Sequence, residues 1–165
     1  MSKLVFDRHA HTLTLFDRQG NQPGKSWLAG NNVDSGHRLP GQVGLPAGVY
    51  VFKFDAHQRH GKKKGDTSSG SFGPMGIFAL EDFSYQGTTH SGVGIHSGRK
   101  NKADGLKRSG PEHATHLCVR TTDEAMSMIH LTSMQDPLET LTVQDGATTL
   151  QSRTFIVPRI LKTQA

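Results

Sequence analysis

Nineteen glycines and seven prolines divide the chain into short runs of strand-forming residues. Glycine and proline interrupt regular structure, so this frequent punctuation favours short strands joined by turns over long helices. Hydrophobic residues make up 33% of the 165 positions, enough for the continuous core of one domain. We therefore expect residues 1–165 to form a single, mainly β domain with one or two short helices.

Apolar and β-branched residues indicate where the strands lie. Residues 4–6 and 13–16 predict an opening hairpin, and residues 26–30 predict a third strand. Residues 45–54 show the clearest alternation, so this strand is expected at the centre of the sheet. Further short strands are expected at 76–80, 92–96, 141–143 and 154–157.

A helix is expected directly after the only cysteine. Thr121 and Glu124 have the spacing of a capping box, in which two side chains bond the first backbone N–H groups of a helix. The apolar face of this helix would consist of Ala125, Met126, Met128, Ile129 and Leu131.

The charge balance limits the possible partners. Lys and Arg exceed Asp and Glu by 19 to 14, and no basic helix with interleaved aromatic residues is present. Because the excess is modest and such a helix is missing, nucleic acid is a weaker inference than an acidic small substrate or an anionic wall polymer. Residues 57–71 predict a mobile basic loop, and residues 97–114 predict a basic insertion over a site. No apolar run is long enough to predict a membrane span.

Cys118 has the surroundings expected of a reactive thiol. As the only cysteine it cannot form an intrachain disulfide. A catalytic cysteine acts as a thiolate, so it needs a base or cation nearby and amides for the oxyanion. Cys118 precedes the expected helix N-terminus, whose dipole favours negative charge, and Arg120 adds a cation. His96 ends a glycine-lined strand and His116 shares a strand face with Cys118, so either could be the base.

Other interpretations of these residues remain open. Cys118 alone could be a buried structural thiol. Zinc prefers imidazole and thiolate ligands, so a zinc amidase or peptidase is a second hypothesis, although the spacing matches no common zinc motif. Its ligands would come from His96, His113, His116 and Cys118. The histidines expected at the surface or in packing are His57, His60, His90 and His130.

The segment 115–120 reads Thr-His-Leu-Cys-Val-Arg and resembles the Ser/Thr-His-Gly-Cys-Val-Arg signature of YkuD-type L,D-transpeptidases. Upstream, the His-Ser-Gly at 96–98 resembles the His-Gly or His-Ser element of that family. The Leu-Pro-Ala-Gly-Val-Tyr at 45–50 is similar to its Thr-Pro-x-Gly-x-Tyr segment. The resemblance extends from the N-terminus to the helix after the cysteine, and implies a YkuD-like β-sandwich or mixed sheet packed against that helix.

The resemblance also implies peptidoglycan chemistry without metal or organic cofactor. In that family the cysteine forms a thioester with the diamino acid of a stem peptide and releases the terminal D-alanine. An acceptor amine then gives crosslinking or exchange, and water gives L,D-carboxypeptidase activity. By resemblance, Cys118 is the nucleophile and His96 its base. His116 and Thr115 would shape the site, and the amides of Leu117 and Cys118 would form the oxyanion hole. Arg120 would fix the loop or a carboxylate. Ser97 and Gly98 of the histidine element are the other implied site residues.

The chain departs from the family pattern in two ways. Leu117 stands where the family has glycine, and the spacing from His96 to Cys118 is longer than usual. The basic insertion at 97–114 accounts for the extra length if it loops out. The added Cβ at Leu117 affects backbone freedom beside the oxyanion hole, so a non-catalytic wall-binding module is a third hypothesis.

The start of the chain bears on where the protein acts. Residues 1–6 are too short an apolar stretch, and too soon followed by charged residues, to predict a signal peptide. We therefore expect synthesis in the cytoplasm, whereas the implied substrate lies outside it. The missing signal peptide points to a subset of the proteins that the chain resembles, the L,D-transpeptidase-like effectors that bacteria deliver into competitors through type VI secretion. The resemblance then implies an antibacterial toxin acting in the periplasm of the target cell, with an immunity protein and a component of the secretion apparatus as partners.

Overall fold

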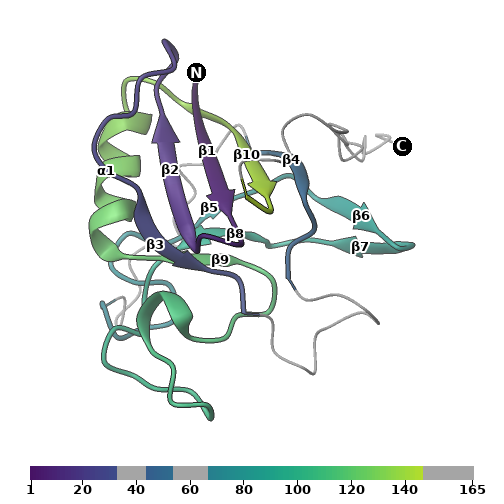
Figure 1. The fold of residues 1–165 in the computed structure, drawn as a ribbon, viewed down its shortest axis with the longest axis vertical. Helices are drawn as coiled ribbons and strands as arrows, with labels where there is room; N and C mark the ends of the chain where they lie inside the picture. The colour runs from purple at the N-terminus through teal and green to yellow at the C-terminus, as the bar shows by residue number, and fades with distance from the viewer. Residues whose placement is uncertain (33–43, 54–66, 147–165) are drawn as a thin grey trace, which may run out of the picture.

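The computed structural model describes residues 1–32, 44–53 and 67–146 (Figure 1). In this part of the chain, eight strands form a mixed sheet, two form a separate hairpin, and one α-helix accompanies them. The predicted mainly β class is therefore confirmed. Outside the described residues lie the strand predicted at 154–157, most of the loop predicted at 57–71, and His57 and His60.

The large sheet has the strand order β4-β10-β1-β2-β3-β9-β8-β5. Its pairs are antiparallel except for β1 with β10 and β8 with β9, which are parallel. The strands are β1 (Ser2–Asp7), β2 (Thr12–Phe16), β3 (Trp27–Gly30), β4 (Gly48–Val51), β5 (Phe78–Ala79), β8 (Gly94–His96), β9 (Val119–Thr121) and β10 (Leu138–Gln144).

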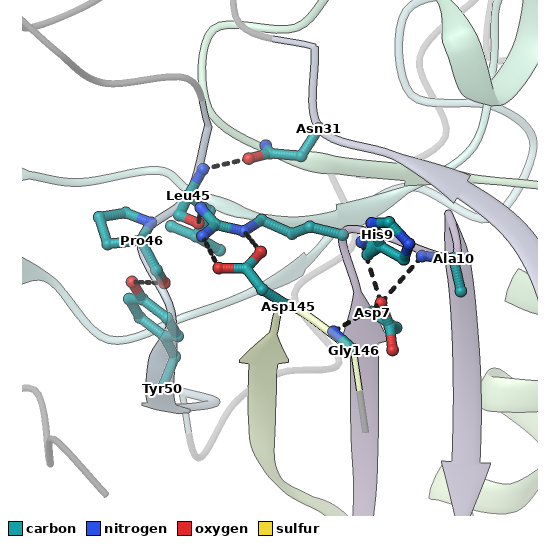
Figure 2. Close-up of polar contacts among 10 residues, drawn as sticks. Asp7, His9, Ala10, Asn31, Leu45, Pro46, Tyr50, Asp145 and Gly146 are labelled. Atoms are coloured by element: carbon teal, nitrogen blue, oxygen red, sulfur yellow. Dashed lines mark hydrogen bonds and ion pairs between the residues drawn. The ribbon is translucent and has the colours of Figure 1, made fainter. Parts of the chain in front are cut away.

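The predicted opening hairpin is confirmed. Strands β1 and β2 pair antiparallel with Leu4 opposite Leu15. These two leucines are fully buried. Along each of the two strands, buried residues alternate with more exposed ones, as a strand with one buried face requires. Asp7 stabilises the connection, because its carboxylate accepts the backbone N–H groups of His9 and Ala10, both at 2.9 Å (Figure 2). The third strand and those predicted near 76–80, 92–96 and 141–143 are also present.

The strand predicted at 45–54 is shorter than expected and lies at one end of the strand order. The prediction of a central position is wrong, since β4 pairs with β10 alone. Beyond β4, Phe52 forms a bridge with Leu80, which follows β5. The sheet therefore curls until its two end strands meet. Because the curl buries Tyr50 and Phe52 almost completely, the sequence of β4 has the alternation of a central strand.

The helix after the cysteine is α1 (Asp123–Ser133), and it begins later than predicted. Thr121 belongs to β9, and Thr122 is the N-cap, its hydroxyl accepting the N–H of Ala125 at 3.1 Å. Strand β9 occupies the residues between the cysteine and the helix because it is held between β3 and β8. Leu131 is 56% exposed, so its predicted place on the apolar face is wrong. The buried residues of α1 are Ala125, Met126, Ile129 and Ser133.

The separate hairpin of β6 (Phe83–Tyr85) and β7 (Thr88–His90) was not predicted, and it extends away from the large sheet in Figure 1. Gln86 and Gly87 form its turn with positive φ at both positions, as a type I′ turn requires. The strands carry mostly polar, exposed residues, so no apolar alternation in the sequence predicts them. In the described ranges, no helix is long and apolar enough to cross a membrane.

Candidate active site

The parallel pairing of β8 and β9 brings the central candidate residues together. His96 is in register with Arg120, and Ile95 with Val119. Residues in register point to the same face of a sheet, as do residues two apart on one strand. Cys118, which directly precedes β9, therefore shares a face with Arg120 and His96.

A cleft of about 430 Å³ contains these side chains. Most of the predicted site residues line it, namely Cys118, His96, His116, Thr115, Leu117 and Arg120. The remaining lining comes from residues 71–72, 90–93 and 113–114 and from Arg99. Cys118 is partly exposed in this cleft, so the interpretation of a fully buried structural thiol does not apply.

Ser97 and Gly98, although predicted as site residues, are not part of the cleft lining. Ser97 is fully buried, and its carbonyl accepts a hydrogen bond from Nη1 of Arg120 at 3.0 Å. A Cβ on Gly73 would lie 2.0 Å from the Ser97 hydroxyl, and a Cβ on Gly98 would lie 2.3 Å from the carbonyl oxygen of Gly70. These glycines allow the chain at 70–73 to pack directly against the end of β8.

The ring of His96 is buried and oriented from two sides. Its Nδ1 lies 2.7 Å from the carbonyl oxygen of Ser97, and Phe72 packs edge-to-face on the ring with centroids 5.0 Å apart. A carbonyl only accepts, so Nδ1 carries the proton of the neutral ring and Nε2 carries the lone pair. The imidazole thus has the tautomer that a base acting through Nε2 needs.

The thiol of Cys118 lies against the backbone that leads into β8. Its sulfur is 3.7 Å from the carbonyl oxygen of Gly92. Burial raises the pKa of the thiol above its usual value, and the N–H of Gly94, the positive charge of Arg120 and the amide of Cys118 itself oppose this without outweighing it. The resting group at neutral pH is therefore the thiol, which needs a base.

The predicted support from a helix dipole is wrong. Three residues of β9 separate Cys118 from Thr122, and α1 begins only at Asp123. A helix dipole acts within its first turn, whereas a strand of this length carries the chain roughly 10 Å away. Arg120, not α1, supplies positive charge near the sulfur.

Asn31 fixes the backbone around the cysteine. Its Nδ2 donates to the carbonyl oxygens of Leu117 at 2.6 Å and Cys118 at 2.9 Å, and the hydroxyl of Thr115 also donates to Cys118 at 2.8 Å. Its Oδ1 accepts the N–H of Leu45 (Figure 2). Asn31 was not among the predicted site residues, because a single asparagine after a strand gives no local sign of partners so distant in sequence.

Leu117 does not require the conformation of the family's glycine. Its side chain is buried in the main core cluster, and it is not among the non-glycine residues with positive φ in the described ranges. An ordinary L-residue is thus accommodated next to the cysteine.

An ion pair between Arg8 and Asp145 stabilises the backbone at Leu45, which Asn31 also contacts. Nε of Arg8 donates to Asp145 at 2.6 Å, and its Nη1 donates to the carbonyl oxygen of Leu45 at 2.9 Å. Figure 2 shows Asp145 and Leu45 in this network, with Asn31 on the other side of Leu45. The hydrogen bond and charge of Asp145 raise the pKa of Arg8, so the guanidinium stays charged.

The remaining histidines contribute to the cleft wall. His116 is exposed, and Nδ1 of His113 lies 2.9 Å from the carbonyl oxygen of Ala114. His90 stacks on Phe83 with centroids 5.3 Å apart, in keeping with its expected packing role, but it also lines the cleft. In the part of the chain that the structure describes, no three His, Cys, Asp or Glu side chains form a group that could hold a metal ion, so the proposed zinc ligands are not assembled.

The basic insertion is ordered by one carboxylate. Asp104 accepts the backbone N–H groups of Leu106 and Arg108, and the Arg108 Nε at 2.9 Å. These bonds hold the pKa of Asp104 well below its usual value. The two ends of the insertion, at Arg99 and His113, line the cleft, whereas residues 100–112 are not part of its lining.

Comparison with known proteins agrees with the resemblance read from the sequence. The YkuD family, described as the L,D-transpeptidase catalytic domain, matches residues 2–138. A crystal structure of an L,D-transpeptidase from Stackebrandtia nassauensis is 14% identical with a TM-score of 0.44, and the alignment covers 86% of this chain and 54% of that one. This chain thus spans about half the length of that protein. No curated protein sequence matches the chain. The family match covers most of the sequence, including the histidine element at 96–98 and the segment 115–120 with Cys118, so the chain belongs to the YkuD family of L,D-transpeptidase catalytic domains.

Proposed function

We propose that this chain acts on peptidoglycan as a cysteine-dependent L,D-transpeptidase or L,D-carboxypeptidase, removing the terminal D-alanine of tetrapeptide stems. The observation that carries the proposal is that Cys118 and His96 line one open cleft in a YkuD domain. The order of the histidine element and the cysteine segment along the chain supports it as well.

In the first step, Nε2 of His96 takes the thiol proton of Cys118 and the sulfur attacks the carbonyl carbon of the diamino acid. The raised pKa of the thiol makes such a base necessary at neutral pH. The bond between Ser97 and Nδ1 stabilises the imidazolium that forms. The C–N bond then breaks, the amine of D-alanine leaves with the proton from His96, and the acyl group remains on sulfur as a thioester.

The amide of Cys118 is the best-supported donor to the oxyanion. In a trans peptide the C=O and N–H point in opposite directions. Asn31 holds the carbonyl of Leu117, which belongs to the same peptide unit, so the N–H of Cys118 is directed away from Asn31. That N–H also lowers the pKa of the Cys118 thiol, which puts it on the side of the sulfur. It can therefore stabilise negative charge that develops there.

The thioester is resolved by an amine or by water. Attack by an acceptor amine forms a new amide and returns the thiol, whereas attack by water gives the tripeptide acid. Both routes proceed through the same acyl-enzyme. Which acceptor dominates depends on its access to the cleft that Cys118 lines.

Mass analysis of a synthetic tetrapeptide incubated with the pure protein tests the proposal. The unmodified chain should release D-alanine and show a mass increase equal to the tripeptide acyl group, while Cys118→Ala should do neither and should retain the circular dichroism and melting temperature of the unmodified chain. His96→Gln should likewise lose turnover. D-alanine release by Cys118→Ala would refute the nucleophile assignment.

The other two hypotheses predict different experimental outcomes. Loss of activity with a chelator but not with iodoacetamide would favour the zinc hydrolase. Binding to purified sacculi without change in the muropeptides would favour the wall-binding module. The toxin role, periplasmic action, immunity protein and secretion partner stay predictions from the sequence.

A further inference from the structure

The lining of the active-site cleft carries positive charge that no residue of the lining balances. Two arginines, Arg99 and Arg120, line it together with four histidines, and the described lining residues include no aspartate or glutamate. A water-filled cleft of one sign of charge attracts ligands of the other. The cleft therefore favours an anionic group on its ligand.

The two arginines bind the same residue, Ser71. Nη2 of Arg99 donates to the hydroxyl of Ser71, and Nη1 of Arg120 donates to its carbonyl oxygen, both at 2.8 Å. Burial lowers the pKa of Arg120 to about 10, and the charge of Arg99 contributes to this shift. Two like charges are thus held close together at a cost in folding free energy.

Neither arginine has a counterion within the described ranges. No ion pair involves Arg99 or Arg120, and the Nε atoms of both are buried without a hydrogen-bond partner. Arg120 is only 4% exposed. Buried cations are ordinarily paired, because an unpaired one loses its hydration without compensation. A bound anion would supply the missing compensation.

Arg99 is also held in an unusual backbone conformation. Its φ is +58°, which L-residues rarely adopt. The surrounding chain maintains it, since the N–H of Arg99 donates to Gly70 and its carbonyl accepts the N–H of Gly110. Residues held in such conformations by their neighbours are frequent at ligand sites.

We infer that Arg99, supported by Arg120, binds the C-terminal carboxylate of the peptide that Cys118 attacks. This inference rests on the proposed function. A guanidinium fork matches the two oxygens of a carboxylate. Arg120 is two residues from Cys118, roughly 6.6 Å along an extended chain. The carboxylate of the leaving D-amino acid is separated from the attacked carbonyl by one nitrogen and one carbon, closer than the other stem carboxylates. Arg99 is then the residue that selects stems ending directly after the cleaved bond.

Binding to the full chain carrying Cys118→Ala separates this inference from catalysis. The probes are a tetrapeptide stem with a free C-terminal carboxylate and the same peptide with a C-terminal carboxamide, titrated by calorimetry. The acid should bind at least about tenfold more tightly than the amide. Arg99→Gln should remove most of this preference by weakening the acid far more than the amide, and Arg99→Lys should retain part of it.

Lys100→Gln is the matched control. It removes the same charge one residue away, but Lys100 is exposed and outside the cleft lining, so the preference should persist. Circular dichroism checks that each variant folds. If Arg99→Gln does not fold, the comparison is made with Arg99→Lys instead. Equal binding of acid and amide, no binding of either, or equal weakening of both by Arg99→Gln would overturn the inference. D-alanine release dependent on Cys118 would still uphold the proposed function in those cases.

Discussion

Two pairs of residues in this molecule show opposite ways of placing an arginine. Arg8 meets Asp145 through two nitrogens and also donates to a backbone carbonyl, and its pKa is raised. Among the described residues, Arg120 donates to the carbonyls of Ser71 and Ser97 and lies near Arg99, and its pKa is lowered to about 10. The first site carries its own counterion, whereas the second leaves a net positive charge facing a cleft.

The difference separates a structural role from a functional one. An arginine that joins distant segments is most stable when a carboxylate neutralises it. An arginine that receives an anionic ligand must keep its charge uncompensated until the ligand binds. Changes at the two sites should therefore affect different measurements, activity at Arg120 and stability at Arg8.

The largest effect is expected from Arg120→Met. This change removes the bond to the Ser97 carbonyl, which also orients His96, and removes the charge that favours a thiolate at Cys118. Turnover of the tetrapeptide should fall about a hundredfold or more. The free energy of unfolding should change little, because loss of an uncompensated buried charge offsets the lost hydrogen bonds. A stability loss without a loss of turnover would reverse the assignment of roles.

Asn31→Ala tests the connection between the two regions. Asn31 bonds Leu45 on the Arg8 side and the carbonyls of Leu117 and Cys118 on the cleft side. Its removal takes away the bonds to the Leu45 N–H and the Leu117 carbonyl, while Thr115 still donates to the carbonyl of Cys118. It should cost about 2–3 kcal/mol in denaturant unfolding, together with a loss of turnover. Asn32→Ala is the control, since its side chain makes one exposed bond to Glu112 and should cost less than about 1 kcal/mol. Equal effects of the two changes would contradict a special role for Asn31.

Arg8→Met should give a smaller effect on stability and none on chemistry. The side chains of Arg8 and Asp145 are 22% and 49% exposed, so solvent screens the pair and its loss should cost about 1 kcal/mol. Turnover should stay within about twofold of the unmodified chain, because Arg8 is outside the cleft lining. A large fall in turnover would show that the two regions are coupled through Leu45.

The smallest effect concerns acid stability. The hydrogen bond from Arg8 lowers the pKa of Asp145 below its usual value of 3.8. A lowered folded-state pKa means that the pair stabilises the fold above that usual value, and that the contribution is lost as pH falls through the lowered pKa. Unfolding curves between pH 5 and pH 2, roughly, should therefore be less pH-dependent for Arg8→Met than for the unmodified chain. Identical pH dependence would indicate that the pair contributes nothing in solution.

Some local elements could be predicted because their causes lie within a few residues. The alternation of Leu4, Phe6, Leu13 and Leu15 predicts a hairpin, and a threonine followed by acidic residues predicts a helix start. The polar hairpin β6–β7 was missed because its strands bury little apolar surface. The position of β4 was wrong because a curled sheet buries an end strand as fully as a central one.

By itself, the sequence determined the family, the mainly β class and the candidate nucleophile and base, since these follow from short motifs and local patterns. Only the tertiary structure decided which residues surround Cys118. The parallel pairing of β8 with β9 sets His96 beside Arg120. The packing of the neighbouring loops then brings both Arg99 and Arg120 to Ser71. Such contacts join residues that are distant in the chain, and their energy depends on burial and hydrogen bonding that exist only after the sheet has formed.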